Sequence, residues 1–160
     1  MNIDCSIPNT NLNNAIAMEI KTDVLINATP QKVWAILADF DNYSSWNPFL
    51  QSVKGELKVG SKLTVTIKQS EAKGTTFKPT VLIVEPAKQL SWLGRLLIPG
   101  IFDGEHKFEL FDNHNGTTTF RQSEKFSGIL VPLFKKQLDS NTAAGFEAMN
   151  KKLKDLVEQK

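Results

Sequence analysis

The sequence is poor in the residues that build disulfide frameworks and metal sites. Its 160 residues include one cysteine, Cys5, and two histidines, His106 and His114. A single cysteine excludes a disulfide within the chain, and it leaves the redox compartment open while favouring the cytoplasm. Because His114 lies in a turn rich in Asn and Gly and only His106 remains, the ligands for a zinc site are too few. We therefore expect no metal and no cofactor.

Long apolar runs and a large charge of one sign are also missing. No apolar run approaches the ~20 residues that cross a bilayer. The 19 basic and 17 acidic residues leave a net charge of +2, which gives no global field to attract nucleic acid or anionic lipid. Gly-rich phosphate loops, dinucleotide fingerprints and Gly-x-Ser-x-Gly elbows are absent. We expect neither a nucleic-acid partner nor integral membrane association.

Residues 1–17 differ in composition from the rest of the chain. They are rich in Asn, without basic residues and without an apolar core, so they do not match a secretory signal. We expect a disordered leader over 1–17. The remaining length suits one domain with one core, over 18–160.

The first half of this domain begins with a strand and two short helices. Alternation over 18–27 predicts the strand. Thr29 before Pro30 predicts a helix that runs to about residue 38, and Asp41 predicts the cap of a second one over 41–46. Turn signals then separate six further expected strands, with the spacing of an antiparallel meander, at 50–55, 62–69, 76–84, 89–93, 102–111 and 117–126.

The last segment changes to helical periodicity. Apolar residues recur at spacings of three and four over 131–158, which predicts one long amphipathic helix. Gly145 lies on or beside its apolar stripe, where it permits either close approach to the sheet or room for a ligand. The sequence thus predicts an α+β fold: a curved, seven-stranded antiparallel sheet with two short helices, wrapped around a C-terminal helix and enclosing a cavity.

Five stretches carry a resemblance to a known superfamily. They are Ala-Thr-Pro-Gln-Lys-Val-Trp at 28–34, Trp-Asn-Pro-Phe at 46–49, Phe-Asp-Gly-Glu-His-Lys-Phe at 102–108, Glu-Lys-Phe-Ser-Gly-Ile-Leu at 124–130 and Thr-Ala-Ala-Gly-Phe-Glu-Ala-Met-Asn at 142–150. With the elements in this order, the chain resembles the polyketide cyclase and START-like superfamily, whose helix-grip fold is shared with the major birch-pollen allergen. The resemblance implies a small hydrophobic ligand, because members bind sterols, lipids, quinones, hormones or polyketides, and a few are enzymes.

Side-chain parity in two strands places polar groups on the inner wall. Even-numbered residues of 102–111 and 117–126 carry the large apolar side chains, so His106, Gln122 and Glu124 point inward with them. This parity favours an odd loop such as 112–116, and sets Phe108 opposite Phe120 and His106 opposite Gln122, with Glu124 on the diagonal. Two interpretations are open: the polar groups satisfy one another, or they orient a ligand, with His106 and Glu124 as acid and base in an enzyme.

Three further features have alternative interpretations. Trp46 either plugs the open end of the sheet or, with Asn47, borders the cavity entrance. Arg95 either covers apolar surface with its stem or anchors a carboxylate or enolate of the ligand. The apolar segment 96–101 is either a lid over the cavity or an ordinary part of the core.

The function that these observations favour is binding of a small hydrophobic or amphipathic ligand, of lipid, polyketide or aromatic type, in an internal cavity. The alternatives are a cyclase, aromatase or dehydratase enzyme and an accessory or chaperone-interaction module. The expected ligand-binding residues are Trp46, Asn47, Trp92, Arg95, His106, Phe108, Phe120, Gln122, Glu124, Phe146 and Met149.

Overall fold

The computed structural model describes residues 17–68, 74–96 and 98–159. The predicted leader therefore lies outside the described residues, except for Ala17, which begins the first strand. The helices are α1 (Pro30–Leu37), η2 (Phe40–Asn42, a 3₁₀ turn), α2 (Tyr43–Trp46) and α3 (Val131–Glu158). The strands are β1 (Ala17–Ile26), β2 (Leu50–Lys54), β3 (Thr64–Ile67), β4 (Thr75–Phe77), β5 (Thr80–Glu85), β6 (Gln89–Leu96), β7 (Phe102–Asp112) and β8 (Thr118–Ser127).

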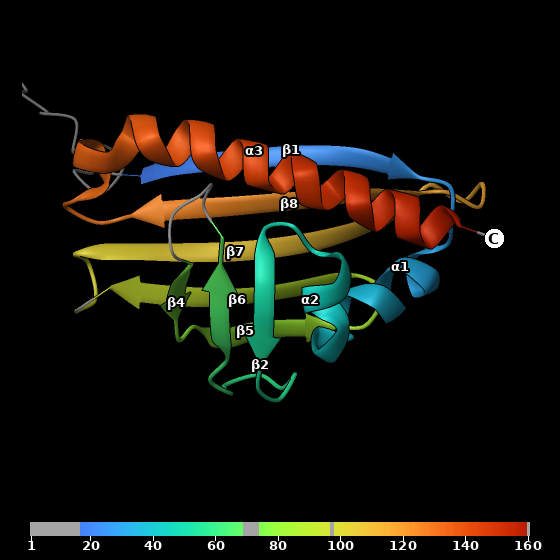
Figure 1. Ribbon diagram of the computed structural model, residues 1–160, viewed down its shortest axis with the longest axis horizontal. Coiled ribbons are helices and arrows are strands. Elements are labelled where there is room, and N and C mark those ends of the chain that lie inside the picture. Colours follow the sequence, from blue (N-terminus) through green and yellow to red (C-terminus); the bar gives the residue numbers. More distant parts are fainter. Residues whose placement is uncertain (1–16, 69–73, 97, 160) are drawn as a thin grey trace, which may run out of the picture.

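The strands form two antiparallel sheets, and one long helix covers part of the larger sheet. The larger sheet has the order β1-β8-β7-β6-β5, and the smaller has the order β2-β3-β4. Helix α3 runs along β1 and β8, and the small sheet and α2 lie on the same side of the large sheet as α3 (Figure 1). The predicted α+β architecture, a curved antiparallel sheet that grips a C-terminal helix, is confirmed. The bounds of α3 are those predicted from its periodicity.

The predicted number of seven strands is wrong, because the segment expected as one strand over 76–84 forms two. β4 pairs with β3 in the small sheet, whereas β5 pairs with β6 in the large one. Pro79 lies between them and has no N–H to continue a ladder. Its carbonyl instead accepts a hydrogen bond from the Leu63 amide at 2.9 Å.

Residues 60–63 continue this contact along the outer side of β5. The Gly60 amide donates to the Val81 carbonyl, and the Val81 amide donates to the Ser61 carbonyl, both at 2.9 Å. Together with the bond from Leu63 to Pro79, these backbone bonds tie the small sheet to the large one.

The two short helices begin differently. Thr29 is the N-cap of α1 as predicted, but its carbonyl accepts the bonds from Lys32 and Val33, and its side chain makes no capping hydrogen bond within the described part of the chain. Asp41 is not a cap. It lies inside η2, which begins after Asp39.

The β7–β8 turn fixes the register of the inner wall. The loop has five residues, 113–117, so the prediction of an odd loop is right, but the pairing is shifted by two residues from the predicted one. His106 faces Glu124, Phe108 faces Gln122 and Leu110 faces Phe120.

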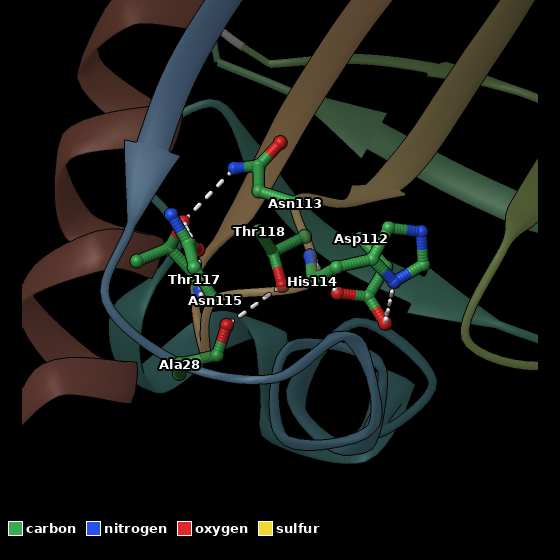
Figure 2. Close-up of polar contacts among 7 residues, drawn as sticks. All are labelled: Ala28, Asp112, Asn113, His114, Asn115, Thr117 and Thr118. Carbon is green, nitrogen blue, oxygen red and sulfur yellow. Dashed lines mark hydrogen bonds and ion pairs between the residues drawn. The ribbon is translucent and has the colours of Figure 1, made fainter.

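Side chains in the turn explain the shift (Figure 2). The backbone N–H of Asn113 donates to the Thr117 carbonyl at 3.1 Å. The backbone N–H of Thr117 donates to the side-chain oxygen of Asn115, Oδ1, also at 3.1 Å, so Thr117 belongs to the loop. The buried Thr118 hydroxyl donates to the Ala28 carbonyl at 2.7 Å, which holds β8 in position. Local polar contacts of this kind decide the register where parity alone permits two loops of odd length.

Candidate functional site

Two glycines face each other in the middle of the large sheet. Gly94 of β6 is paired directly with Gly104 of β7, on the inner face. A Cβ at Gly104 would lie 2.6 Å from Glu124 Oε1, and one at Gly94 would lie 3.3 Å from the Phe77 ring. Neither position has room for a larger side chain without displacing a neighbour, and the bare backbone forms a hollow in the sheet.

A cavity of about 240 Å³ lies above this hollow. The small sheet and α3 close it on the other sides. Its wall contains five aromatic side chains and only a few polar groups. The main lining residues are Phe49, Leu50, Ile67, Thr75, Phe77, Trp92, Leu96, Phe102, His106, Glu124, Phe126, Leu138 and Thr142.

The His106–Glu124 pair is the polar centre of this wall. His106 Nδ1 lies 2.5 Å from Glu124 Oε2, and the histidine is only 3% exposed. The Trp92 ring stacks on the imidazole at 4.9 Å with an interplanar angle of 11°. Because a ring stack and a short hydrogen bond hold the imidazole, its orientation is fixed before any ligand enters.

Gln122 contacts the other side of the imidazole. Its Nε2 lies 3.3 Å from His106 Nε2 and 3.5 Å from Met149 Sδ. With the Gln122 amide as donor, Nε2 is the acceptor, so Nδ1 carries the proton and donates to Glu124. In this arrangement the pair presents a carboxylate, and Glu124 Oε1 lies over the bare backbone of Gly104.

The structure divides the predicted site residues into three groups. Trp92, Arg95, His106 and Glu124 line the cavity. Five others lie in the packed core beside it, where α3 is close to the sheet: Phe108, Phe120, Gln122, Phe146 and Met149. The third group, Trp46 and Asn47, lies outside the cavity wall.

The residues of the third group have structural contacts. Asn47 Oδ1 accepts hydrogen bonds from the amides of Phe49 and Leu50, at 3.0 and 2.9 Å, and so holds the turn from α2 into β2. The Trp46 ring packs edge-on against Tyr43, with centroids 5.3 Å apart.

Arg95 borders the cavity, but its charged group is turned toward Asp103. The Arg95 Nε lies 3.8 Å from Asp103 Oδ1, and the arginine side chain is 51% exposed. Arg95 and Asp103 are direct partners in the β6–β7 register.

Two further features from the sequence, the segment 96–101 and Gly145, lie next to the cavity wall. Leu96 lines the cavity together with Phe102 just beyond the segment, and Leu97 lies outside the described residues. At Gly145 the absent side chain makes room for the Phe49 ring, because an added Cβ would overlap that ring. Close approach is thus the use of this glycine, and the group that approaches is a cavity-wall aromatic.

Sequence reasoning missed most of the cavity wall. Parity already placed Phe102 and Phe126 on the inner face, and glycines inside two neighbouring strands were a usable signal for a hollow. By contrast, the residues from the small sheet and from α3 had no such signal, because their contact with the hollow depends on the packing of separate elements.

Within the described residues, no three His, Cys, Asp or Glu side chains gather in a way that would hold a metal ion. Nor does any helix of the described part of the chain combine the length and the hydropathy of a membrane-spanning segment.

The fold and the cavity together define a helix-grip protein, in which a curved sheet and a long helix enclose a mostly apolar space. Within this class, the chain belongs to the family described as polyketide cyclase / dehydrase and lipid transport, whose model matches residues 17–158. No curated protein matches the chain in sequence.

Solved structures share the fold at low sequence identity. The Zhui aromatase/cyclase from Streptomyces sp. R1128 has a TM-score of 0.73 at 14% identity, over 89% of this chain and 94% of that chain. A truncated norcoclaurine synthase from Thalictrum flavum has a TM-score of 0.68 at 14% identity, over 91% and 96%. A START superfamily protein from Mycobacterium smegmatis has a TM-score of 0.68 at 19% identity, over 88% and 97%.

Proposed function

We propose that the protein binds a small hydrophobic or amphipathic molecule, of lipid, polyketide or aromatic type, in the cavity between sheet and helix. The observation that carries this proposal is the cavity wall itself, which is aromatic and aliphatic except for a few polar groups around His106–Glu124. Apolar pockets with a few convergent polar groups are typical of small-molecule sites. A cytoplasmic location, which the single cysteine favours, is part of the proposal.

The volume of the cavity limits the part of the ligand that it encloses. An apolar cavity of about 150 Å³ binds benzene. The 240 Å³ cavity therefore suits about one to two aromatic rings, or an acyl segment of similar volume. A larger ligand would extend past Leu96, which is exposed, into solvent.

The family supports the same kind of ligand. Its description includes lipid transport, and the similar structures include an aromatase/cyclase and a START superfamily protein. These likenesses support an apolar ligand.

A matched pair of variants tests the proposal. Leu138 lines the cavity from α3, whereas Leu25 is exposed on β1. We expect Leu138→Trp to fill the cavity and weaken uptake of the neutral fluorescent dye N-phenyl-1-naphthylamine at least tenfold, and Leu25→Trp to leave uptake unchanged. Equal uptake by both variants, with both folded by circular dichroism, would place the dye elsewhere and reject the proposal.

The His106–Glu124 contact favours a second candidate function, an enzyme of the cyclase, aromatase or dehydratase kind. A histidine and a carboxylate in hydrogen-bond contact at an apolar cavity can move protons on a bound polyketide-type substrate. In this mechanism the Glu124 carboxylate accepts a proton from the substrate and later returns it as an acid, while the His106 Nδ1–H that donates to Glu124 holds the carboxyl group in position.

Glu124→Gln separates binding from turnover. It keeps the shape of the side chain and removes the base, so an enzyme is expected to retain dye uptake and lose about 10²-fold or more in turnover of a polyketide-type substrate. If wild-type protein leaves such a substrate unchanged in mass while still binding the dye, the binding function stands and the catalytic one falls.

A further inference from the structure

Exposed apolar side chains gather at the end of the molecule where α3 begins. Ile98, Ile129 and Leu133 are 64%, 62% and 77% exposed, and Leu96 and Phe134 are also exposed. We call these five residues the end surface. It comprises the end of β6, Ile98 in the β6–β7 connection, the β8–α3 connection and the first turn of α3, and these elements meet at the left of Figure 1.

Backbone hydrogen bonds hold the two connections side by side. The Ile129 amide donates to the Gly100 carbonyl and the Leu130 amide donates to the Ile101 carbonyl, both at 3.1 Å. The Phe134 ring packs edge-on against Phe102, with centroids 6.2 Å apart. The apolar side chains of the end surface are thus presented by a hydrogen-bonded framework.

The charges around the end surface have a definite order. Residues 96–102 and 126–134 include no charged residue, and Lys135 and Lys136 follow at once, both exposed. Arg95 stands at the other border and is beside Asp103, and Asp139 lies one turn further along α3. The apolar surface therefore has a basic border on one side, at Lys135 and Lys136, which the net charge of +2 conceals.

We propose that the end surface docks the protein on anionic lipid bilayers. Apolar side chains beside lysines are the pattern of interfacial membrane binding, in which the former enter the acyl boundary and the latter meet the headgroups. Each lysine near an anionic surface contributes about fivefold in affinity. A stable protein interface needs about 20–30 residues a side, and five side chains fall well short of that.

Docking would place the cavity against the bilayer. Leu96 belongs to the end surface and also lines the cavity, together with Phe102. Apart from Leu96, the residues of the end surface are not in the cavity wall. The docking proposal therefore holds whether or not the cavity binds a small molecule.

Vesicle co-sedimentation of the full chain tests docking. We expect binding to vesicles of equal parts phosphatidylcholine and phosphatidylglycerol and much weaker binding to phosphatidylcholine alone. Ile129→Asp is expected to lower affinity for the anionic vesicles at least tenfold. The control Val59→Asp changes a residue that is equally exposed, at 59%, between β2 and β3, and is expected to bind as wild type does.

Charge is tested separately. The double variant Lys135→Gln/Lys136→Gln is expected to lose about tenfold or more and most of the salt dependence. The control double variant Lys32→Gln/Lys152→Gln removes two exposed lysines from other places. Docking is overturned if wild type binds neither vesicle, if the control variants lose as much, or if Ile129→Asp abolishes only a self-association seen without lipid.

Discussion

Gly104 has a hydrogen atom where other residues have a side chain, and the Glu124 carboxylate occupies the space that is left. Glu124 Oε1 lies 2.6 Å from the point that a Cβ would occupy. Since a carboxylate cannot share that space with a methyl group, the geometry of the His106–Glu124 pair requires glycine at position 104.

Gly104→Ala is therefore expected to displace Glu124 and weaken its bond to His106. Gly94→Ala is the matched control, because it adds the same methyl group to the partner strand, toward Phe77. NMR of the His106 imidazole should show a large shift change for Gly104→Ala and a small one for Gly94→Ala. Overpacking of this size costs about 1–3 kcal/mol, so the stability of both variants should be measured as well.

A pair of oppositely charged residues, Asp23 and Arg121, lies on the outer face. Arg121 Nε and Nη2 donate to the two carboxylate oxygens of Asp23, at 2.7 and 2.8 Å. These hydrogen bonds hold the pKa of Asp23 below its ordinary value of 3.8. Because the folded-state pKa is the lower one, the pair stabilises the fold above the unfolded value, and this stabilisation is lost as pH falls through the folded value.

Asp23→Asn is expected to lower stability at pH 7 by less than about 1 kcal/mol, since the pair is exposed. The difference from wild type should vanish well below pH 3.8. Urea midpoints at both pH values measure it. A difference that persists in acid would mean that packing or the neutral hydrogen bonds, rather than the charge, stabilise this pair.

Among single residues, parity was the most reliable guide. It placed His106 and Glu124 on the inner face, where they do meet. It did not determine which partners face each other, because a shift of two residues preserves every inside and outside position. The contacts of Asn113, Asn115 and Thr118 decided between the two registers.

At the scale of elements, α3 combines a good helical pattern with a glycine in its middle. In an exposed helix, Gly→Ala stabilises by about 1 kcal/mol. Here the Phe49 ring occupies the space, and it also packs edge-on against Phe146 with centroids 5.5 Å apart. Helix propensity and packing therefore act in opposite directions at Gly145.

Gly145→Ala is expected to destabilise the protein by about 1–3 kcal/mol despite the better propensity. In a Phe49→Ala background the same change is expected to stabilise, because the clash is gone. The four proteins form a double-mutant cycle that chemical denaturation can measure. An effect of equal size and sign in both backgrounds would show that Phe49 does not restrict this position.

The bounds of a helix or strand could be predicted where a single sequence pattern covered it. The period of α3 and the Thr29-Pro30 start of α1 gave correct elements. By contrast, the alternation over 76–84 continues across Pro79, and nothing in it marks a change of sheet. The physical signal for the division is the proline within the strand pattern, because it has no N–H for the ladder.

At the scale of the whole molecule, the cavity is the part of the space between the two sheets and α3 that side chains do not fill. Phe108, Phe120, Phe146 and Met149 fill the space where α3 is close to the sheet, and the paired glycines leave it open further along. Hydrophobicity alone does not separate a core aromatic from a cavity-wall aromatic, so five of the eleven predicted ligand-binding residues came from the filled part.

The domain boundary remains a prediction at this scale. Residues 1–14 include little apolar surface to offset the entropy of ordering, so deleting them is expected to leave Tm nearly unchanged. Differential scanning calorimetry of the full chain and the deletion measures this. A Tm lower by several degrees would place these residues within the fold.

The backbone bonds between residues 60–63 and β5 also bear on aggregation. An outermost strand with free amides and carbonyls is a template on which another chain can add a strand. Along β5, the bonds made by Gly60, Ser61 and Leu63 occupy groups of Val81 and Pro79 that such a chain would need. The proline that divides the two sheets thus also removes a donor from the edge where molecules would otherwise join.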